Sequence, residues 1–146
     1  MSDLVRLSFS IEKTLHDKLE NLLRDSGYEN RSEFIRDLIR DQLVRLEWDR
    51  DQQVVGTITL IYDHHRRMLS EKLTSLQHHH HEAILASTHV HLDPHMCAEV
   101  VIVRGRAGEV KHIADELRQQ KGVLHAGLSI GSTGEQFLET HHGHEQ

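Results

Sequence analysis

Three histidines and the only cysteine of the chain lie close together in THVHLDPHMC, residues 88–97. His89 and His91 are two residues apart, which places both side chains on one face of a β-strand, about 6.5–7 Å apart along it. Cys97 follows a predicted turn, at the start of an antiparallel strand, and can approach the same face. Imidazole and thiolate together suit Zn, Cu or Ni and disfavour Mg or Ca. The pattern H-x-H-x5-C therefore predicts a soft-metal site with at least one open coordination position.

A run of four histidines, QHHHHE at 77–82, offers candidates for the missing ligand. His78 to His81 end a predicted helix. A helix end and a strand face of one chain need not meet, so the fourth ligand can come from another subunit. Taken singly, a strand histidine is more often a surface residue, and a lone cysteine more often buried apolar filler. The joint pattern favours a specific metal site.

Two other metal chemistries remain open on these residues alone. A catalytic zinc site would use two histidines, one cysteine and water, but no motif supplies an obvious general base, and no spacing recommends Glu82 or Glu99. A storage protein would bind many nickel or copper ions through its 15 histidines. The terminal group HHGHEQ is expected to be a disordered polar tail with weak metal affinity.

Composition restricts the class of protein. The chain has 146 residues, with 27% charged and 37% apolar residues, as in an ordinary globular protein of one domain or two small ones. It lacks a signal-peptide pattern or a stretch that could cross a membrane, so a cytoplasmic protein is expected. The net charge of −6 argues against non-specific nucleic-acid binding, so any contact with DNA must depend on pattern.

Hydrophobic periodicity predicts the elements that position these residues. Residues 4–11 alternate as a half-buried strand, and 12–26 and 30–48 have helical period, with Asn30 and Glu33 in a capping-box arrangement. The polar stretch WDRDQQ is predicted to be a linker. Strands near 54–62, 82–92, 97–104 and 123–130 then enclose helices at 63–77 and 107–120. The order β-α-β-β-α-β is the split βαβ pattern, so the predicted fold class is α+β.

The first strand has no partner within the first 50 residues, so its edges would expose unpaired backbone groups. About 45 residues also bury too little apolar surface to be stable alone. Pairing with a second chain would solve both problems and give a two-stranded ribbon that presents Arg6, Ser8 and Ser10 twice. Such a ribbon fits the major groove, where Arg pairs with guanine and Ser with various base edges. The helix start at Asn30, Arg31 and Ser32 could hold a phosphate. The alternative is a dimerisation module whose exposed strand face is simply solvated.

Residues 6–43, RLSFSIEKTLHDKLENLLRDSGYENRSEFIRDLIRDQL, resemble a ribbon-helix-helix DNA-binding domain, with its G-Y-x-N-R-S-E turn. That resemblance places Arg6, Ser8 and Ser10 at the base-reading positions. Ser8 and Ser10 depart from the usual Thr, which leaves the operator sequence open.

The arrangement QHHHHEAILASTHVHLDPHMC closely resembles the nickel-responsive repressors of the NikR family, and the resemblance extends from Arg6 to about Leu128. It implies a ribbon-helix-helix domain at 1–50, an ACT-like, ferredoxin-like metal-binding and tetramerisation domain at 51–132, and a tail at 133–146. The implied Ni(II) site is square planar, one per subunit, with His89, His91 and Cys97 from one chain and His78 from a neighbour.

The same resemblance assigns further roles. Tyr62 and Gln77 would support the site from outside it. Glu33 and Asp37 would hold a second cation between the domains, and Arg66 and Arg67 would contact the DNA backbone. The chain is then expected to be no enzyme but a homotetrameric repressor, a dimer of dimers, that binds a palindromic operator when nickel is bound.

Overall fold

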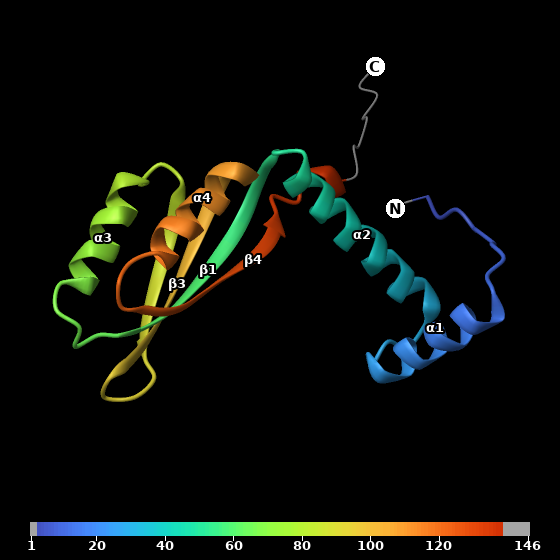
Figure 1. The fold of residues 1–146 in the computed structure, drawn as a ribbon. Helices are drawn as coiled ribbons and strands as arrows, with labels where there is room; N and C mark the ends of the chain where they lie inside the picture. The colour runs from blue at the N-terminus through green and yellow to red at the C-terminus, as the bar shows by residue number, and fades with distance from the viewer. Residues whose placement is uncertain (1–2, 139–146) are drawn as a thin grey trace, which may run out of the picture. The chain divides into compact units, whose positions relative to one another are not determined.

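The computed structural model describes residues 3–138, which divide into two compact units, residues 3–42 with 137–138 and residues 43–136. The elements in chain order are α1 (Lys13–Asp25), α2 (Arg31–Asp49), β1 (Gln53–Asp63), α3 (Leu69–His79), β2 (Ile84–His91), β3 (Met96–Arg106), α4 (Ala107–Arg118), β4 (Val123–Ser132) and a short 3-10 helix, η1 (Glu135–Phe137) (Figure 1). None of the helices described is long and apolar enough to cross a membrane.

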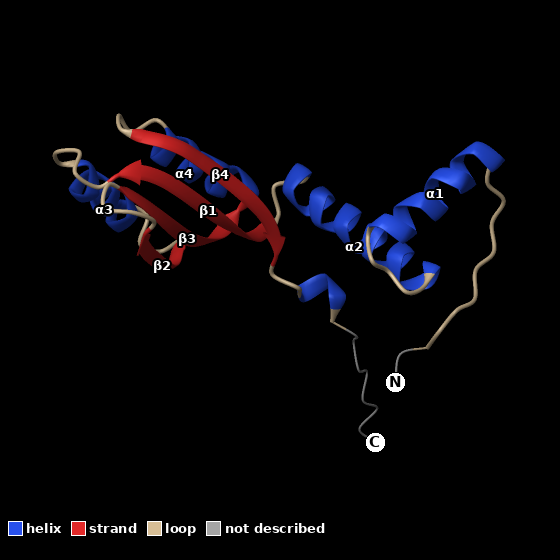
Figure 2. Cartoon of the chain, turned by 90° about the horizontal axis from the view of Figure 1, so that it is seen from below, coloured by secondary structure: helices blue, strands red, loops and turns tan. Residues whose placement is uncertain are grey.

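The second unit is a four-stranded antiparallel sheet with the strand order β2-β3-β1-β4. Helices α3 and α4 pack on one face of this sheet (Figure 1), and the opposite face carries neither of them (Figure 2). Side chains of β1 and β3 alternate between buried and less buried, because successive residues of a strand point to opposite faces. The predicted β-α-β-β-α-β order and the α+β class are confirmed.

The core lies between the sheet and its two helices. Ile58 and Leu60 of β1, Val101 of β3, Leu73 of α3 and Ile113 of α4 are fully buried there. Trp48, in the last turn of α2, joins this core and donates its indole N–H to the carbonyl oxygen of Gly131 at 2.9 Å. The stretch predicted to be a polar linker therefore begins with a core residue.

The first unit buries little apolar surface. Helices α1 and the first part of α2 bury Leu23 and Phe34, whereas Leu38 and Ile39 of the predicted apolar stripe remain 50% and 52% exposed. Asn30 Oδ1 accepts the backbone N–H of Glu33 at 2.9 Å, which confirms the predicted cap of the second helix. The single chain thus leaves an apolar helical face uncovered.

Two predicted elements differ from the structure. Residues 4–11 form no strand in the described chain, and Phe9 is 65% exposed, because the backbone partners that a strand needs are not available within one chain. The helix expected from residue 63 begins only at Leu69. Residues 64–68 make turns instead, and Met68 has a left-handed backbone with φ of 64° immediately before the helix.

Candidate metal centre

The register of the β2–β3 hairpin places one predicted ligand, His91, beside Cys97 and a second, His89, next along the same strand face. His91 pairs directly with Cys97, and His89 pairs with Glu99. Directly opposite residues of an antiparallel pair share a face of the sheet, so all four side chains lie on the face where Cys97 joins the core formed with α3 and α4. The Sγ of Cys97 lies 3.3 Å from Nδ1 of His91, and the rings of His89 and His91 have centroids 5.1 Å apart.

A third ligand-type side chain reaches this thiol from the turn after β1. Donor atoms of His64, His91 and Cys97 all lie within 4.8 Å of one another. Nδ1 of His64 is buried and has no hydrogen-bond partner among residues 3–138, and the His64 ring centroid is 4.9 Å from that of His91. A buried polar atom without a partner costs free energy that a bound cation would recover. Three nitrogen and sulfur donors converging on one point fit a soft divalent ion.

The thiol itself is fully buried. Burial raises the pKa of Cys97 above its ordinary value, and the nearby carboxyl groups of Asp63, Asp93 and Glu99 raise it further. The same carboxyl groups favour a cation beside the sulfur. A bound metal ion would stabilise the thiolate that these surroundings disfavour.

A buried carboxyl group connects this site to helix α3. Glu99, only 8% exposed, accepts hydrogen bonds from Ser87 Oγ at 2.7 Å, Gln77 Nε2 at 2.9 Å and the Tyr62 hydroxyl at 3.2 Å. The Tyr62 oxygen also lies 3.5 Å from Nδ1 of His89. Burial and the adjacent Glu99 raise the pKa of Tyr62, so its hydroxyl remains a donor. Tyr62 and Gln77 thus lie where residues supporting the site would be expected.

His78 is the predicted ligand that the described chain does not bring to Cys97. It lies in the last turn of α3, exposed, and lines two shallow surface hollows, one with Ser70 and Ser75 and one with His81 and Ile84. In the described part of the chain, the cluster around Cys97 includes neither His78 nor His89. An exposed imidazole beside a hollow is accessible to another molecule.

Two further histidines form a separate contact. Glu116 of α4 bonds Nε2 of His80 at 2.7 Å and Nε2 of His112 at 2.8 Å. The bond to His80 lowers the pKa of Glu116 below its ordinary value. This bridge ties the end of α3 to α4, so His80 acts here as a link between helices.

The predicted DNA-contacting residues of the first unit are mostly exposed. Arg6, Ser8 and Ser10 lie in the extended segment before α1. Arg31 makes an ion pair with Glu20, with 2.5 Å between Nη2 and Oε1, next to the cap residue Asn30. A phosphate at this helix start would compete with Glu20 for the guanidinium group.

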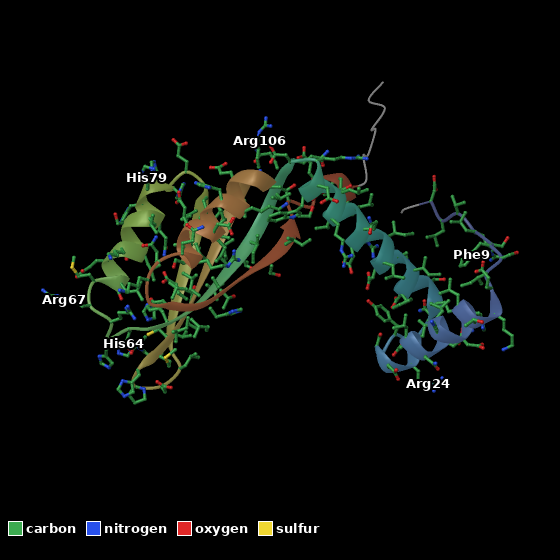
Figure 3. All side chains as sticks on the ribbon, viewed as in Figure 1. Phe9, Arg24, His64, Arg67, His79 and Arg106 are labelled. Atoms are coloured by element: carbon green, nitrogen blue, oxygen red, sulfur yellow. The ribbon has the colours of Figure 1, made fainter. Side chains whose placement is uncertain are left out.

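The remaining predicted residues lie in two places. Asp37 accepts hydrogen bonds from Tyr28 at 2.7 Å and from Arg40 at 3.0 Å. The hydrogen bond from Tyr28 holds the pKa of Asp37 below its ordinary value. Among residues 3–138, Glu33 and Asp37 are not part of a group of three metal-type ligands. Arg66 and Arg67 are exposed in the turn before α3, where Arg67 lies at the same end of the second unit as His64 (Figure 3).

Sequence reasoning assigned no role to His64 or Ser87, and it considered Glu99 only as a general base and set it aside. No periodicity relates the turn after β1 to the β2–β3 hairpin, so the approach of His64 depends on the pairing of Tyr62 with Cys97. The doublet His64–His65 was the only available signal. Glu99 could be recognised only through its pairing with His89, which places an acidic residue on the buried face.

Comparison with known proteins identifies both units. Residues 55–130 match the family model of the NikR C terminal nickel binding domain, and residues 5–46 match that of the ribbon-helix-helix proteins of the copG family. A relative from Geobacter sulfurreducens is 52% identical over 94% of this chain and 99% of its own length. One from Pyrococcus abyssi is 45% identical over 93% and 99%. Both carry the name "Putative nickel-responsive regulator".

Among solved structures, uncharacterized protein TM1266 from Thermotoga maritima superposes with a TM-score of 0.49 at 15% identity, over 54% of this chain and 98% of that one. The family models and the curated relatives both cover the two units and the hairpin that holds Cys97. The chain belongs to the nickel-responsive regulator family, as a ribbon-helix-helix protein with a C-terminal nickel-binding domain.

Proposed function

We propose that this regulator represses nickel-uptake genes by binding a palindromic operator when Ni(II) is bound, one ion per subunit. His89, His91 and Cys97 of one chain and His78 of a neighbouring chain would hold the ion. The supporting observation is the cross-strand pair of His91 and Cys97, with 3.3 Å between Nδ1 and Sγ, on the strand that also carries His89.

Each side chain has a defined task in this proposal. Cys97 gives up its proton and supplies a thiolate from a buried position. The Tyr62 oxygen would accept a hydrogen bond from the N–H at Nδ1 of His89 and so orient that ring. Nε2 of His89 would then keep the lone pair that binds the ion. When bound, the ion supplies a fixed positive charge that keeps the sulfur deprotonated.

Glu99 gives the site a route to helix α3. Its carboxylate accepts hydrogen bonds from Tyr62, which lies beside His89, and from Gln77 of α3. Gln77 directly precedes His78 in the sequence. Ordering of His89 therefore favours the position of α3 in which His78 faces a neighbouring chain. A ligand shifts an equilibrium only by its difference in affinity for the two states, and a site shared between chains has such a difference.

Assembly as a dimer of dimers is supported by apolar surface in both units. The sheet face without helices carries Val100 and Ile102, partly buried, and Val90, 49% exposed. In the first unit the helical face with Leu38 and Ile39 is open. Patches of this kind are expected to meet copies of themselves in a symmetric oligomer.

Operator contact is assigned to the first unit. Paired residues 4–11 of two chains would place Arg6, Ser8 and Ser10 in the major groove. The helix start at Asn30, Arg31 and Ser32 would hold phosphate, and Arg66 and Arg67 would add backbone contacts. Glu33 and Asp37 would hold a second cation.

The decisive experiment uses Cys97→Ala. DNA fragments selected from a random pool by the nickel-loaded parent chain serve as the probe, and binding is followed by fluorescence anisotropy with and without nickel. We expect nickel affinity to fall by more than about a hundredfold and nickel-dependent DNA binding to disappear, with the fold retained. His125→Ala, which removes an exposed imidazole of β4, is the matched control.

Parental DNA binding by Cys97→Ala in nickel would refute this mechanism. The two rival classes give different results in the same assay. A zinc hydrolase would show metal-dependent turnover and no DNA binding. A storage protein would take up many ions per chain and would lose little capacity in Cys97→Ala.

A further inference from the structure

The last turn of helix α3 is fastened by polar side chains. Leu73 is the last residue of this helix that is fully buried, and residues 74–79 are partly buried or exposed. His78 lies in this turn and is exposed. Gln77, the residue before it, donates to Glu99 of β3 at 2.9 Å and so fixes the turn from the side of the sheet. The direction in which the His78 imidazole points therefore depends on these contacts.

Two histidines that follow His78 hold the same turn. Nδ1 of His81 lies 3.2 Å from the carbonyl oxygen of His78. A carbonyl oxygen can only accept, so His81 donates this bond and satisfies one of the open carbonyl groups at the end of the helix. Nε2 of His80 lies 2.7 Å from a carboxylate oxygen of Glu116 in α4. Both imidazoles thus act on the end of α3.

The bond between His80 and Glu116 joins two helices that cover the same face of the sheet (Figure 1). The His80 side chain is only 17% exposed and that of Glu116 30%. Nε2 of His112, on α4 itself, lies 2.8 Å from the other carboxylate oxygen and holds it from the second side. An ionised carboxylate can only accept, so Nε2 of His80 carries a proton and binds no ion while this bond exists.

The backbone of His80 is fixed as firmly as its ring. Its N–H lies 3.2 Å from the carbonyl oxygens of both Leu76 and Gln77, at the end of the helix. Its own carbonyl oxygen accepts the N–H of Ala83 at 2.9 Å and that of Ile84 at 3.1 Å. His80 is therefore the residue at which α3 ends and the turn toward β2 begins, so an anchor on its ring fixes both.

From these contacts we infer that Glu116 is a positioning residue for nickel binding. Through its bond with His80 it fixes the end of α3, so that His78 is presented to a neighbouring chain before any ion is bound. Within the run of four histidines, His78 then serves the ion, whereas His80 and His81 serve the helix end. The inference rests on the proposed function, in which His78 is a ligand.

A positioning residue has a thermodynamic signature. When the end of α3 is already fixed, nickel does not have to order it, and this preorganisation raises the affinity. Loss of Glu116 removes that gain only through His78, so substitutions of the two residues should not be additive. A general loss of stability would instead add to the effect of removing His78.

The test measures nickel affinity by equilibrium titration for the full-length parent chain, Glu116→Ala, His78→Ala and the double variant. We expect Glu116→Ala to weaken nickel binding by about tenfold. In the His78→Ala background the same substitution should change the affinity by less than about twofold, because the residue that it positions is gone. Glu116→Gln keeps an oxygen that can accept the His80 N–H and should recover most of the affinity. Asp115→Ala, which removes a carboxylate of α4 paired with Arg118, is the matched control and should bind nickel like the parent.

Hydrogen exchange of the metal-free chain tests the same contact without nickel. The amide groups of residues 80–84 should exchange about tenfold faster in Glu116→Ala than in the parent, because the end of α3 opens more often. Asp115→Ala should exchange like the parent in this segment. Urea unfolding followed by Trp48 fluorescence checks that every variant is folded.

Four results would overturn the inference: unchanged exchange in Glu116→Ala, parental nickel affinity in that variant, additive losses in the double variant, or an equal loss of affinity in Asp115→Ala. Failure of the proposed ligand set would look different. His78→Ala would then bind nickel as tightly as the parent, and the exchange rates would still decide whether Glu116 fixes the end of the helix.

Discussion

At the scale of single residues, the site depends on groups that are costly to bury unless they have partners. Cys97 and Glu99 are two residues apart on β3, and both lie on the helix-covered face. Glu99 accepts hydrogen bonds from three donors within the chain, whereas Nδ1 of His64 has no hydrogen-bond partner in the part of the chain that the structure describes. The Glu99 carboxylate therefore stabilises the fold before any ion binds, and the His64 imidazole near Cys97 is available to an ion.

The spacing of His89, His91 and Cys97 was sufficient to predict that their side chains would share one face of the hairpin, because strand period and hairpin register are local properties. His91 pairs with Cys97, whereas His89 lies outside the donor cluster around the thiol in the described chain. His78 could be assigned only by family resemblance, since a ligand from another chain leaves no trace in local spacing. His64 was not predicted, because its position depends on how β1 pairs with β3.

We predict that Glu99→Leu destabilises the second unit and weakens nickel binding. The substitution leaves the donors of Tyr62, Gln77 and Ser87 without an acceptor, which should cost at least about 1–3 kcal/mol of unfolding free energy. Nickel affinity should fall by about tenfold, because His89 and α3 lose their common anchor. Urea unfolding followed by the fluorescence of Trp48, the only tryptophan, gives the stability, and equilibrium titration gives the affinity.

Glu99→Gln keeps one acceptor oxygen and should show a smaller effect of the same sign. Glu82→Gln, an exposed change in the turn before β2, serves as the control for loss of charge. If Glu99→Leu matched the parent chain in nickel affinity, the proposed link from the hairpin to α3 would be wrong.

At the scale of elements, sequence periodicity predicted the second unit well, because β1, β3, α3 and α4 each bury one face within a single chain. Prediction failed where a local conformation or a missing partner decides the structure. Helix α3 begins late because residues 64–68 turn, with Met68 left-handed. The strand at 4–11 needs a second chain. The end of α2 was predicted to precede a linker, but Trp48 packs on Gly56 of β1.

We predict that Gly56→Ala destabilises the second unit by about 1–3 kcal/mol through overpacking. A Cβ at this position would lie 3.0 Å from the Trp48 ring, 3.0 Å from Val110 and 3.1 Å from Leu128. Trp48 cannot easily move away, because it is buried and its N–H is bonded to Gly131. Urea unfolding followed by Trp48 fluorescence measures the effect.

Gly127→Ala is the matched control in the same sheet. Its added Cβ would meet only the His125 ring, at 3.6 Å, an ordinary contact. There the reduced entropy of the unfolded chain should leave stability unchanged or raise it slightly. Equal destabilisation by both substitutions would show that Trp48 does not limit the space above Gly56.

At the scale of the whole molecule, each unit leaves apolar surface that one chain does not cover. The helical face of the first unit and the helix-free face of the sheet are expected to require separate interfaces with other copies. In the proposed assembly, two kinds of interface in one chain would allow metal binding at the sheet to influence how paired first units meet DNA. The affinity of two linked half-sites then depends on their effective concentration, which assembly sets.

This division of labour predicts that Arg6→Ala abolishes operator binding and leaves nickel binding intact. An arginine paired with guanine contributes about 1–3 kcal/mol of discrimination, and each ribbon carries two copies, so affinity should fall by about tenfold to a hundredfold per copy lost. Lys13→Ala removes the same charge from the first residue of α1, where the ammonium group is exposed and paired with Asp17, and should weaken binding only slightly.

Anisotropy of a labelled selected fragment at saturating nickel gives the affinity, and equilibrium dialysis gives the ions bound per chain. Equal losses in the two variants would mean that Arg6 contributes charge alone and that the segment before α1 does not read bases. Fewer ions bound by Arg6→Ala would mean that the two units are not separable in function, because the donor cluster found among residues 3–138 consists of His64, His91 and Cys97 alone.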